Sequence, residues 1–237
     1  MKDKRLNKAF CTYVALISTD SSLQPRLPQF LLSNGRWLSK RGTAGAATAP
    51  NLHLRVAKTA WSTEESMMWI LATLKAALSG VDKKVLLVWD TASPHITKNV
   101  LLEARRLNFR VVPVPAGLTS LVQPLDTHCF AAMKRRIRER YTQCRSAGDF
   151  NPHAFLKLMS DISSKFLCSV RWATAFEQVG ILDCPHSHLT RALQEYFPDG
   201  KPPLSRNPLS PEELRQLLPK GRQFWYRLWC RERLVLL

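Results

Sequence analysis

The sequence lacks closely spaced cysteine pairs, apolar runs of membrane-spanning length and a balanced share of acidic residues. Its six cysteines lie at positions 11, 129, 144, 168, 184 and 230, with no CxxC pair. This scatter argues against a disulfide framework and predicts reduced thiols in an intracellular protein. The first 18 residues combine a basic start with a short apolar run, but no small-residue cleavage pattern follows. No run approaches the ~20 apolar residues of a membrane span, so we expect a soluble protein.

The shortage of acidic residues gives the chain an unusual charge. Its 35 Lys and Arg face only 18 Asp and Glu, a formal net charge of +17 over 237 residues. Such an excess indicates a polyanionic partner, with nucleic acid ahead of an acidic membrane surface. An incidentally basic protein is the alternative, and charge alone does not indicate catalysis. The hydrophobic share of 45% excludes a disordered chain and predicts a packed core.

The first third of the chain predicts strands followed by a helix. Apolar segments at 9–18 and 27–32, joined by turn residues, predict a hairpin, and 52–57 predicts a further short strand. The apolar stripe over 62–79 predicts a helix, begun by a capping box of Ser62 and Glu65 and ended near Gly80.

The middle of the chain predicts a strand–helix–strand unit. The unbroken apolar run at 85–89 is typical of a strand buried on both faces. A helix at 97–107 and a strand at 110–114 follow, and short joins predict a right-handed parallel crossover. Pro113 makes the second strand a candidate for the edge of the sheet. A basic helix is expected over about 127–145.

The last third predicts helices and a tail. Residues 152–197 indicate two or three helices, and 198–211 form a proline-rich linker. The tail at 212–237 opens with a helix-start pattern and then interleaves aromatic residues with arginine. Such a tail could stack on bases, bind a protein partner or fold back on the body, and all three interpretations stay open.

Two carboxylates form the candidate catalytic constellation. Asp90 ends the buried strand, and Asp126 follows the next strand of the crossover. The ends of parallel strands meet at one edge of a sheet, so the two side chains can converge there. Paired carboxylates hold hard divalent cations, and two such metals roughly 4 Å apart drive phosphodiester cleavage. The alternative is that each aspartate caps the helix after it.

Two further clusters contain residues of the kinds that bind phosphate or zinc. The basic residues of the 127–145 helix predict either a phosphate-contacting surface or a merely solvated face; they are Lys134, Arg135, Arg136, Arg138 and Arg140. Cys184, His186 and His188, with His128 and Cys129, supply zinc-type ligands. Their spacing fits no known finger, so the zinc interpretation is disfavoured.

Two segments resemble a known family. LLVWDTASPHI is similar to the second-aspartate motif of DDE superfamily transposases of the pogo/Tigger/Jerky branch. VPVPAGLTSLVQPLDTHCFAAMKRRI resembles the third-aspartate motif, with matching positions at Pro115, Thr119, Gln123, Pro124 and Asp126. The resemblance covers roughly residues 9–182. It implies an α/β, RNase H-like mixed sheet with flanking helices, and metal-dependent cutting and joining of DNA.

The resemblance assigns roles to individual residues. Asp90 matches the second catalytic carboxylate and Asp126 the third, so Mg²⁺ or Mn²⁺ is the implied cofactor. His95 and Gln123 match residues close to the site. Thr91 stands where the family has asparagine, which puts fine tuning of the metal site in doubt. DNA is the implied partner, with no membrane, and a nuclear location follows.

The first catalytic aspartate of the family has no counterpart in the expected place. It should end a strand that precedes 9–18 and lies between that strand and 85–89 in the sheet. Asp3 lies in a polar segment, and Asp20 is expected at the wrong end of the hairpin. The sheet is therefore expected to be incomplete at its N-terminal side, either in a fragment of a longer protein or in a domesticated one.

These patterns predict three regions. Residues 1–145 form the truncated RNase H-like core, 146–197 its helical end, and 198–237 the linker and basic aromatic tail. The predicted function is DNA binding by a transposase-derived endonuclease domain with impaired cleavage. The alternative is a catalytically dead relic that acts through protein contacts, with the tail at 212–237 as its anchor.

Overall fold

The computed structural model describes residues 11–35, 38, 48–114, 119–146, 151–169 and 171–182. Several predictions concern residues outside these ranges: the linker and tail, the cysteine and histidines at 184–188, Asp3, and the family-matched Pro115. No helix in the described ranges is long and apolar enough to cross a membrane.

A three-stranded sheet contains β1 (Cys11–Val14), β2 (Gln29–Asn34) and β3 (Leu52–Ala57), in the order β1-β2-β3. β1 runs antiparallel to β2, and β3 runs parallel to it. The hairpin and the third strand are thus confirmed. The first strand is shorter than predicted, because Leu16 would pair with Pro28, which has no N–H to donate. The Gln29 side chain bonds both the N–H and the carbonyl of Leu16 instead, each at 2.9 Å.

A second sheet pairs β4 (Val85–Asp90) with β5 (Phe109–Val114) in parallel. Helix α2 (Lys98–Arg106) connects them and is capped by Thr97, whose Oγ1 accepts from the Val100 N–H. The predicted parallel crossover is confirmed.

The cap of helix α1 (Glu64–Ala77) lies one residue later in the chain than predicted. Thr63 is its cap, and the capping box pairs Thr63 with Ser66. The Ser66 hydroxyl accepts from the Thr63 N–H at 2.8 Å, while Glu65 turns outward to bond Arg55. The predicted Ser62–Glu65 box was wrong, because Thr63 and Ser66, each one residue further along the chain, form the box instead. Gly80 has the expected positive φ of 77° just beyond the helix.

The second half of the described chain is helical. Its elements are α3 (Thr119–Val122), a π-helical turn (Leu125–Cys129), α4 (Phe130–Ser146), α5 (Pro152–Asp161), a second π-helical turn (Ile162–Leu167) and α6 (Ala173–Gln178). Two 3₁₀ turns, Gln24–Arg26 and Ser93–His95, lie earlier in the chain. The basic helix was predicted correctly, apart from the π-helical turn at its start.

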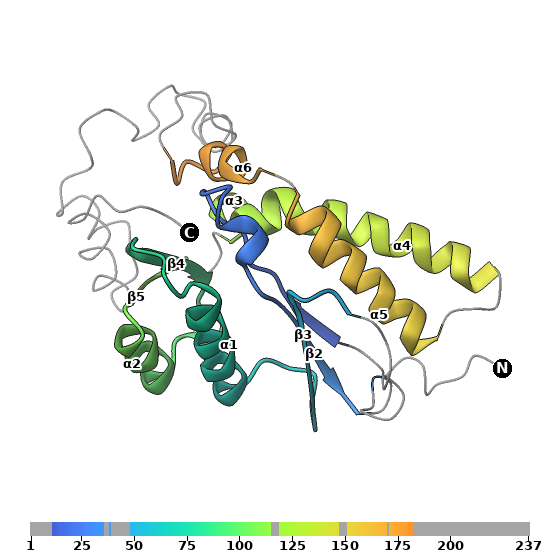
Figure 1. Cartoon of the computed structure of the whole chain (residues 1–237), viewed down its shortest axis with the longest axis horizontal. Coiled ribbons are helices and arrows are strands. Elements are labelled where there is room, and N and C mark those ends of the chain that lie inside the picture. Colours follow the sequence, from blue (N-terminus) through green and yellow to red (C-terminus); the bar gives the residue numbers. More distant parts are fainter. Residues whose placement is uncertain are drawn as a thin grey trace, which may run out of the picture.

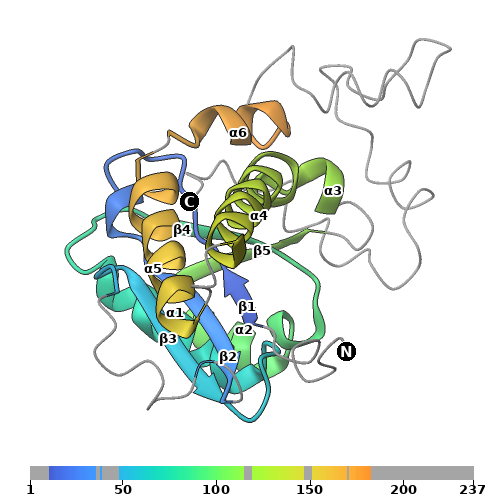
Figure 2. The ribbon, with the colours of Figure 1, turned by 90° about the vertical axis from the view of Figure 1, so that its right-hand side faces the viewer.

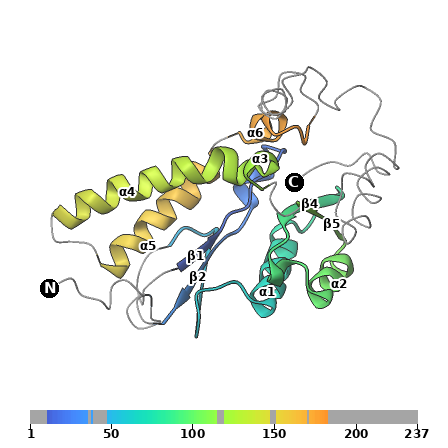
Figure 3. The same cartoon turned by 180° about the vertical axis from the view of Figure 1, so that it is seen from behind.

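Helices cover both sides of the β-structure. Figures 1 and 3 show α1 and α2 on one side of β2 and β3, with α4 and α5 packed together on the other. Alternate residues of β2 point to opposite faces: Phe30 joins the cluster of α1, β4 and β5, while Leu31 joins the cluster of α4, α5 and α6. Gln29, a polar residue of β2, is fully buried, and its side chain donates a hydrogen bond to the Leu16 carbonyl.

The two sheets share a core but do not pair with each other. β1 and β4 each have one edge without a strand partner among the described residues. Next to the open edge of β1, Ala15 and Ile17 are only 4% and 7% exposed, and no described residue bonds their backbone N–H groups. One mixed sheet was predicted, and two sheets are found. The mixed α/β architecture remains compatible with an RNase H-like domain.

Candidate active site

Asp90 lies where β4 ends, and the chain after it folds back onto its carboxylate. Oδ1 accepts from the Ala92 N–H at 3.1 Å and lies 2.5 Å from Nδ1 of His95. The 3₁₀ turn Ser93–His95, started by Pro94, brings the imidazole back to the aspartate. Asp90 therefore holds this turn and does not cap α2, whose cap is Thr97.

The hydrogen bond from His95 sets the charge state of Asp90. Together with the Ala92 N–H, it holds the pKa of this carboxyl below its usual range, against a smaller opposing effect of burial. The aspartate is thus ionised at neutral pH. The carboxylate is 39% exposed, so it remains accessible to a cation from solvent.

Asp126 comes from the π-helical turn that joins α3 to α4. Its backbone N–H bonds the Gln123 carbonyl inside a helical stretch, and no side-chain cap forms there. Partial burial and then the negative charge of Asp90 raise the pKa of Asp126, while Lys134 opposes the shift. The fold therefore brings Asp90 and Asp126 near enough to repel each other. The pKa values of the two carboxyls are shifted in opposite directions.

Asp20 is at the far end of the domain from this pair. Its carboxylate bonds Lys83 at 2.5 Å, and that ion pair with the hydroxyl and N–H of Ser22 lowers its pKa to about 2. Lys83 precedes β4, whereas Asp90 ends it. At a rise of about 3.3 Å per residue, the two ends of the strand are roughly 20 Å apart. The prediction that Asp20 cannot replace the first aspartate agrees with this geometry.

The two carboxylates at this edge of the sheet are the type of ligand that a hard divalent cation prefers. Few such ligands lie there among the described residues. Carboxylate oxygens are what Mg²⁺ and Mn²⁺ prefer, and Mg²⁺ is often held by one or two carboxylates with several waters. Within the described ranges, no three His, Cys, Asp or Glu side chains gather into a metal-binding cluster. Asp90 and Asp126 thus fit one weakly held cation, and nothing described completes a site for two.

Close in sequence to the two aspartates, two buried side-chain atoms have no hydrogen-bond partner: Nε1 of Trp89 and Oε1 of Gln123. Trp89 precedes Asp90, and its ring lies 5.9 Å from that of His95. Gln123 was predicted near the site from the family motif. Trp89 was missed, because a tryptophan within a buried strand resembles an ordinary core residue.

The five basic residues of α4 are exposed, but they divide between two flanks and an outer face. Residues four apart share a side of a helix. Lys134 and Arg138 therefore lie on one flank of the Met133–Ile137 stripe, and Lys134 is close enough to Asp126 to affect its pKa. Arg136 and Arg140 lie on the other flank, where Arg136 covers the Phe166 ring at 4.9 Å. Arg135 faces away from the core.

The zinc candidates in the described ranges do not form a site. His128 Nδ1 pairs with the Thr127 hydroxyl at 2.7 Å. Cys129 is fully buried in the core, and burial raises the pKa of its thiol to about 12. A thiol held neutral in an apolar core is a packing residue and not a metal ligand.

Replacing Asp126 with asparagine is expected to raise the Tm by about 1 °C at pH 7. The side chain is mostly exposed, so the burial penalty and the repulsion from Asp90 together are worth only a few tenths of a kcal/mol. A raised folded-state pKa destabilises the protein above that pKa and costs nothing below the unfolded value. The gain of Asp126→Asn should therefore vanish as the pH falls below about 3.8.

Thermal unfolding of Asp126→Asn across pH 3–8 measures this effect, with Asp82→Asn as the control at an exposed site before β4. A lower Tm for Asp126→Asn at pH 7 would contradict the placement of the two carboxylates.

The comparisons with known proteins identify the family. Residues 18–180, well over half of the chain, match the family described as DDE superfamily endonuclease. No curated protein and no solved structure matches the chain significantly. An endonuclease of this superfamily acts on DNA and generally uses divalent metal ions, which agrees in kind with two converging carboxylates beside a basic helix. The chain belongs to the DDE superfamily endonuclease family.

Proposed function

We propose that this chain is a transposase-derived nuclear domain that binds DNA along α4, beside an incomplete two-carboxylate site. The proposal rests on one observation above all: Lys134, on one flank of α4, lies within electrostatic reach of Asp126. A phosphate contacted by this flank would thus lie next to the carboxylates. The net charge of +17 supports the same partner.

The proposed assignment to the pogo/Tigger/Jerky branch rests on sequence motifs. Thr119, Gln123, Pro124 and Asp126 occupy the spacing of the family's third-aspartate segment. The helical stretch from α3 to α4 contains all four residues.

The proposed lack of the family's first strand is supported by the fold. In an RNase H-like sheet that strand would lie between β1 and β4, where each of these strands has an open edge among the described residues. The carboxylate that ends this strand would be missing with it. The site would then have two of its three acidic ligands.

Asp90 and Asp126 are the residues that would hold Mg²⁺ or Mn²⁺. A bound cation would supply Lewis-acid activation of water and charge neutralisation at the scissile phosphate. Within the chain itself, His95 orients Asp90 and keeps it ionised. Because the described residues bring only two carboxylates to this edge, we propose that metal affinity and cleavage are impaired. The alternative of a relic acting through protein contacts depends on the tail at 212–237, outside the described residues.

Fluorescence anisotropy with a labelled duplex tests the proposed function. The full chain is expected to bind duplex DNA at 50 mM salt and to lose about 10³-fold in affinity at 200 mM, because phosphate contacts release counterions. Any cutting of that duplex with Mg²⁺ or Mn²⁺ should be weak and should disappear in Asp90→Ala. The proposal fails if no duplex or single strand is bound at 50 mM salt, or if robust cutting survives Asp90→Ala.

A further inference from the structure

Gln123 has a buried side-chain oxygen that no described residue uses as an acceptor. Its Oε1 is closed off from solvent and receives no hydrogen bond from the described part of the chain. A buried acceptor without a donor is unfavourable and uncommon in folded proteins. A bound ion or water molecule is one of the ordinary explanations for such an atom.

The backbone fixes Gln123 one helical turn before Asp126. The Gln123 N–H donates to the Thr119 carbonyl at 3.1 Å, and the Gln123 carbonyl accepts from the N–H groups of Asp126 and Thr127, each also at 3.1 Å. Pro124, between them, has helical dihedral angles of φ −57° and ψ −32°. Residues three apart on a helix are neighbours on its surface. The side chains of Gln123 and Asp126 therefore leave the same side of this turn.

Asp90 faces the same side of β4 as this turn. Leu87 and Trp89 belong to the cluster of α1, β4 and β5, and alternate strand residues point to opposite faces, so Asp90 points away from that cluster. On the other side, Leu125 packs against the cluster of α4, α5 and α6. Figure 2 shows α3 and α4 above β4 and β5 in that view, with α1 and α2 below them. The charge of Asp90 raises the pKa of Asp126, which agrees with this placement.

The groups that could donate to the Gln123 amide are engaged or face away. Nε1 of Trp89, the other unpaired buried atom, lies on the strand face opposite to Asp90. The Thr127 hydroxyl bonds the main-chain carbonyl of Gln123 at 3.1 Å and Nδ1 of His128 at 2.7 Å. The side-chain oxygen of Gln123 is thus left as an acceptor beside the two carboxylates.

An amide oxygen is chemically suited to the cation that the carboxylates would hold. Carbonyl and carboxylate oxygens are both hard ligands, and both suit Mg²⁺, Mn²⁺ and Ca²⁺. The last torsion of a glutamine side chain is only loosely restricted, so its oxygen can adjust to a bound ion. The amide is neutral, so it adds a ligand without adding charge.

We propose that Oε1 of Gln123 is the third protein ligand of a divalent cation held by Asp90 and Asp126. This inference rests on the two-carboxylate site of the proposed function and adds a ligand to it. The cation meets two negative charges at this site and not three. Because ligand charge sets the affinity of such sites, Mg²⁺ or Mn²⁺ is bound more weakly here than by three carboxylates.

Mn²⁺ binding to the full chain without DNA tests the assignment. Free aqueous Mn²⁺ gives a sharp electron paramagnetic resonance spectrum that is lost on binding, so a titration yields the Kd. Gln123→Met, which removes the oxygen and keeps the length of the side chain, should weaken binding about tenfold. Gln123→Glu, which adds a third charge, should tighten it about tenfold. Gln143→Glu, the same change at an exposed position of α4, should match the native chain.

Thermal unfolding distinguishes a metal ligand from a residue that only supports the fold. Because Oε1 has no donor in the metal-free protein, Gln123→Met should keep or raise the Tm in EDTA. Saturating Mn²⁺ should raise the Tm of the native chain more than that of Gln123→Met. A fall of more than about 2 °C for Gln123→Met in EDTA would show that the amide has a structural role instead.

The outcomes separate this inference from the proposed function. Mn²⁺ affinity that is lost in Asp90→Asn but unchanged by both Gln123 substitutions overturns the amide ligand and leaves the two-carboxylate site intact. Failure of the native chain to bind Mn²⁺, or binding that survives Asp90→Asn, overturns the amide ligand together with the metal site. DNA binding measured by anisotropy in EDTA is independent of both results and tests the proposed DNA partner alone.

Discussion

Neutralising Lys134 and Arg138 together is expected to weaken duplex binding by about 10- to 100-fold at 100 mM salt. Each lost phosphate contact reduces the salt slope by about 0.9, so the slope should fall by roughly 2. These two side chains share one flank of α4, and Lys134 on that flank is close enough to Asp126 to affect its pKa. Fluorescence anisotropy over a salt series gives both quantities for Lys134→Gln with Arg138→Gln.

The other flank of the same helix supplies a control with the same change in charge. Arg136→Gln with Arg140→Gln also removes two positive charges four residues apart. Arg136 covers Phe166, and Arg140 donates to Gln143 at 3.1 Å, so these cations already have contacts within the protein. We expect less than about a threefold loss in affinity. Equal losses for the two double variants would show that general charge, and not one face of α4, determines binding.

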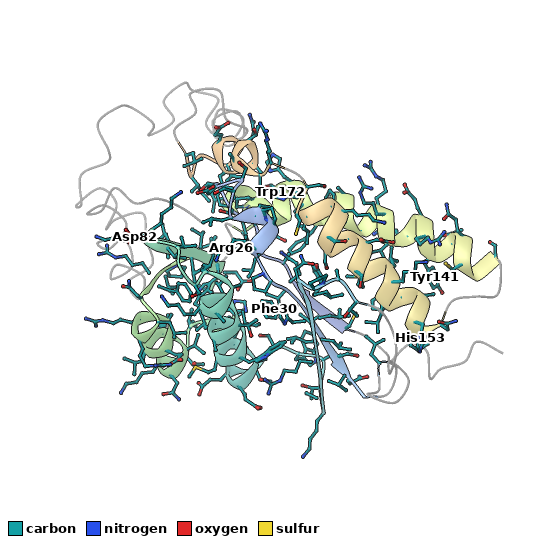
Figure 4. All side chains as sticks on the ribbon, viewed as in Figure 1. Arg26, Phe30, Asp82, Tyr141, His153 and Trp172 are labelled. Carbon is teal, nitrogen blue, oxygen red and sulfur yellow. The ribbon has the colours of Figure 1, made fainter. Side chains whose placement is uncertain are left out.

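Replacing Phe30 with alanine is expected to destabilise the domain by about 3–5 kcal/mol, the usual range for a buried phenylalanine. Phe30 is fully buried in β2, and its ring meets that of Trp69 edge-on at 5.1 Å. Figure 4 places it at the centre of the molecule, between α1 and the β-structure. For a domain of this size the Tm should fall by about 10 °C.

The loss of Phe30 should also loosen the second sheet. No strand hydrogen bonds connect β1–β3 with β4–β5 in the described residues, so the shared apolar cluster around Phe30 must couple them. Native-state hydrogen exchange should show faster exchange in β4 and β5 as well as in β2. Leu102→Ala, on an exposed surface, should change stability by less than about 0.5 kcal/mol. Unchanged protection of β4 and β5 in Phe30→Ala would show that the sheets are held together in another way.

Periodic apolar patterns predicted most of the elements because they report burial directly. The run at Val85–Trp89 is buried toward its start and lies in a parallel pair, as its unbroken apolar character indicates. The convergence of Asp90 and Asp126 followed from the parallel crossover alone. The family motif placed His95 close to the site, but its bond to Asp90 was not predicted, since spacing does not reveal that a 3₁₀ turn folds back.

Other features of the fold depend on tertiary contacts, which the apolar pattern of the sequence does not reveal. The end of β1 is decided by Pro28 on the neighbouring strand and by the substitute bonds of Gln29. The division of the α4 cations depends on where Phe166 packs. The position of the first turn of α1 beside the start of α2 depends on the bonds of Glu64 to Asn99 and Thr97. Each is a tertiary contact between residues distant in the sequence.

Photocrosslinking is the most direct measurement of where DNA lies on the domain. A duplex substituted with 5-iododeoxyuridine is bound to the full chain, irradiated, digested and analysed by mass spectrometry. Crosslinked peptides are expected from residues 126–141, which contain Asp126 and the Lys134–Arg138 flank, and to become scarce in the Lys134→Gln, Arg138→Gln variant. Crosslinks confined to α2 or α5, or unchanged in that variant, would contradict DNA binding beside the Asp90–Asp126 edge.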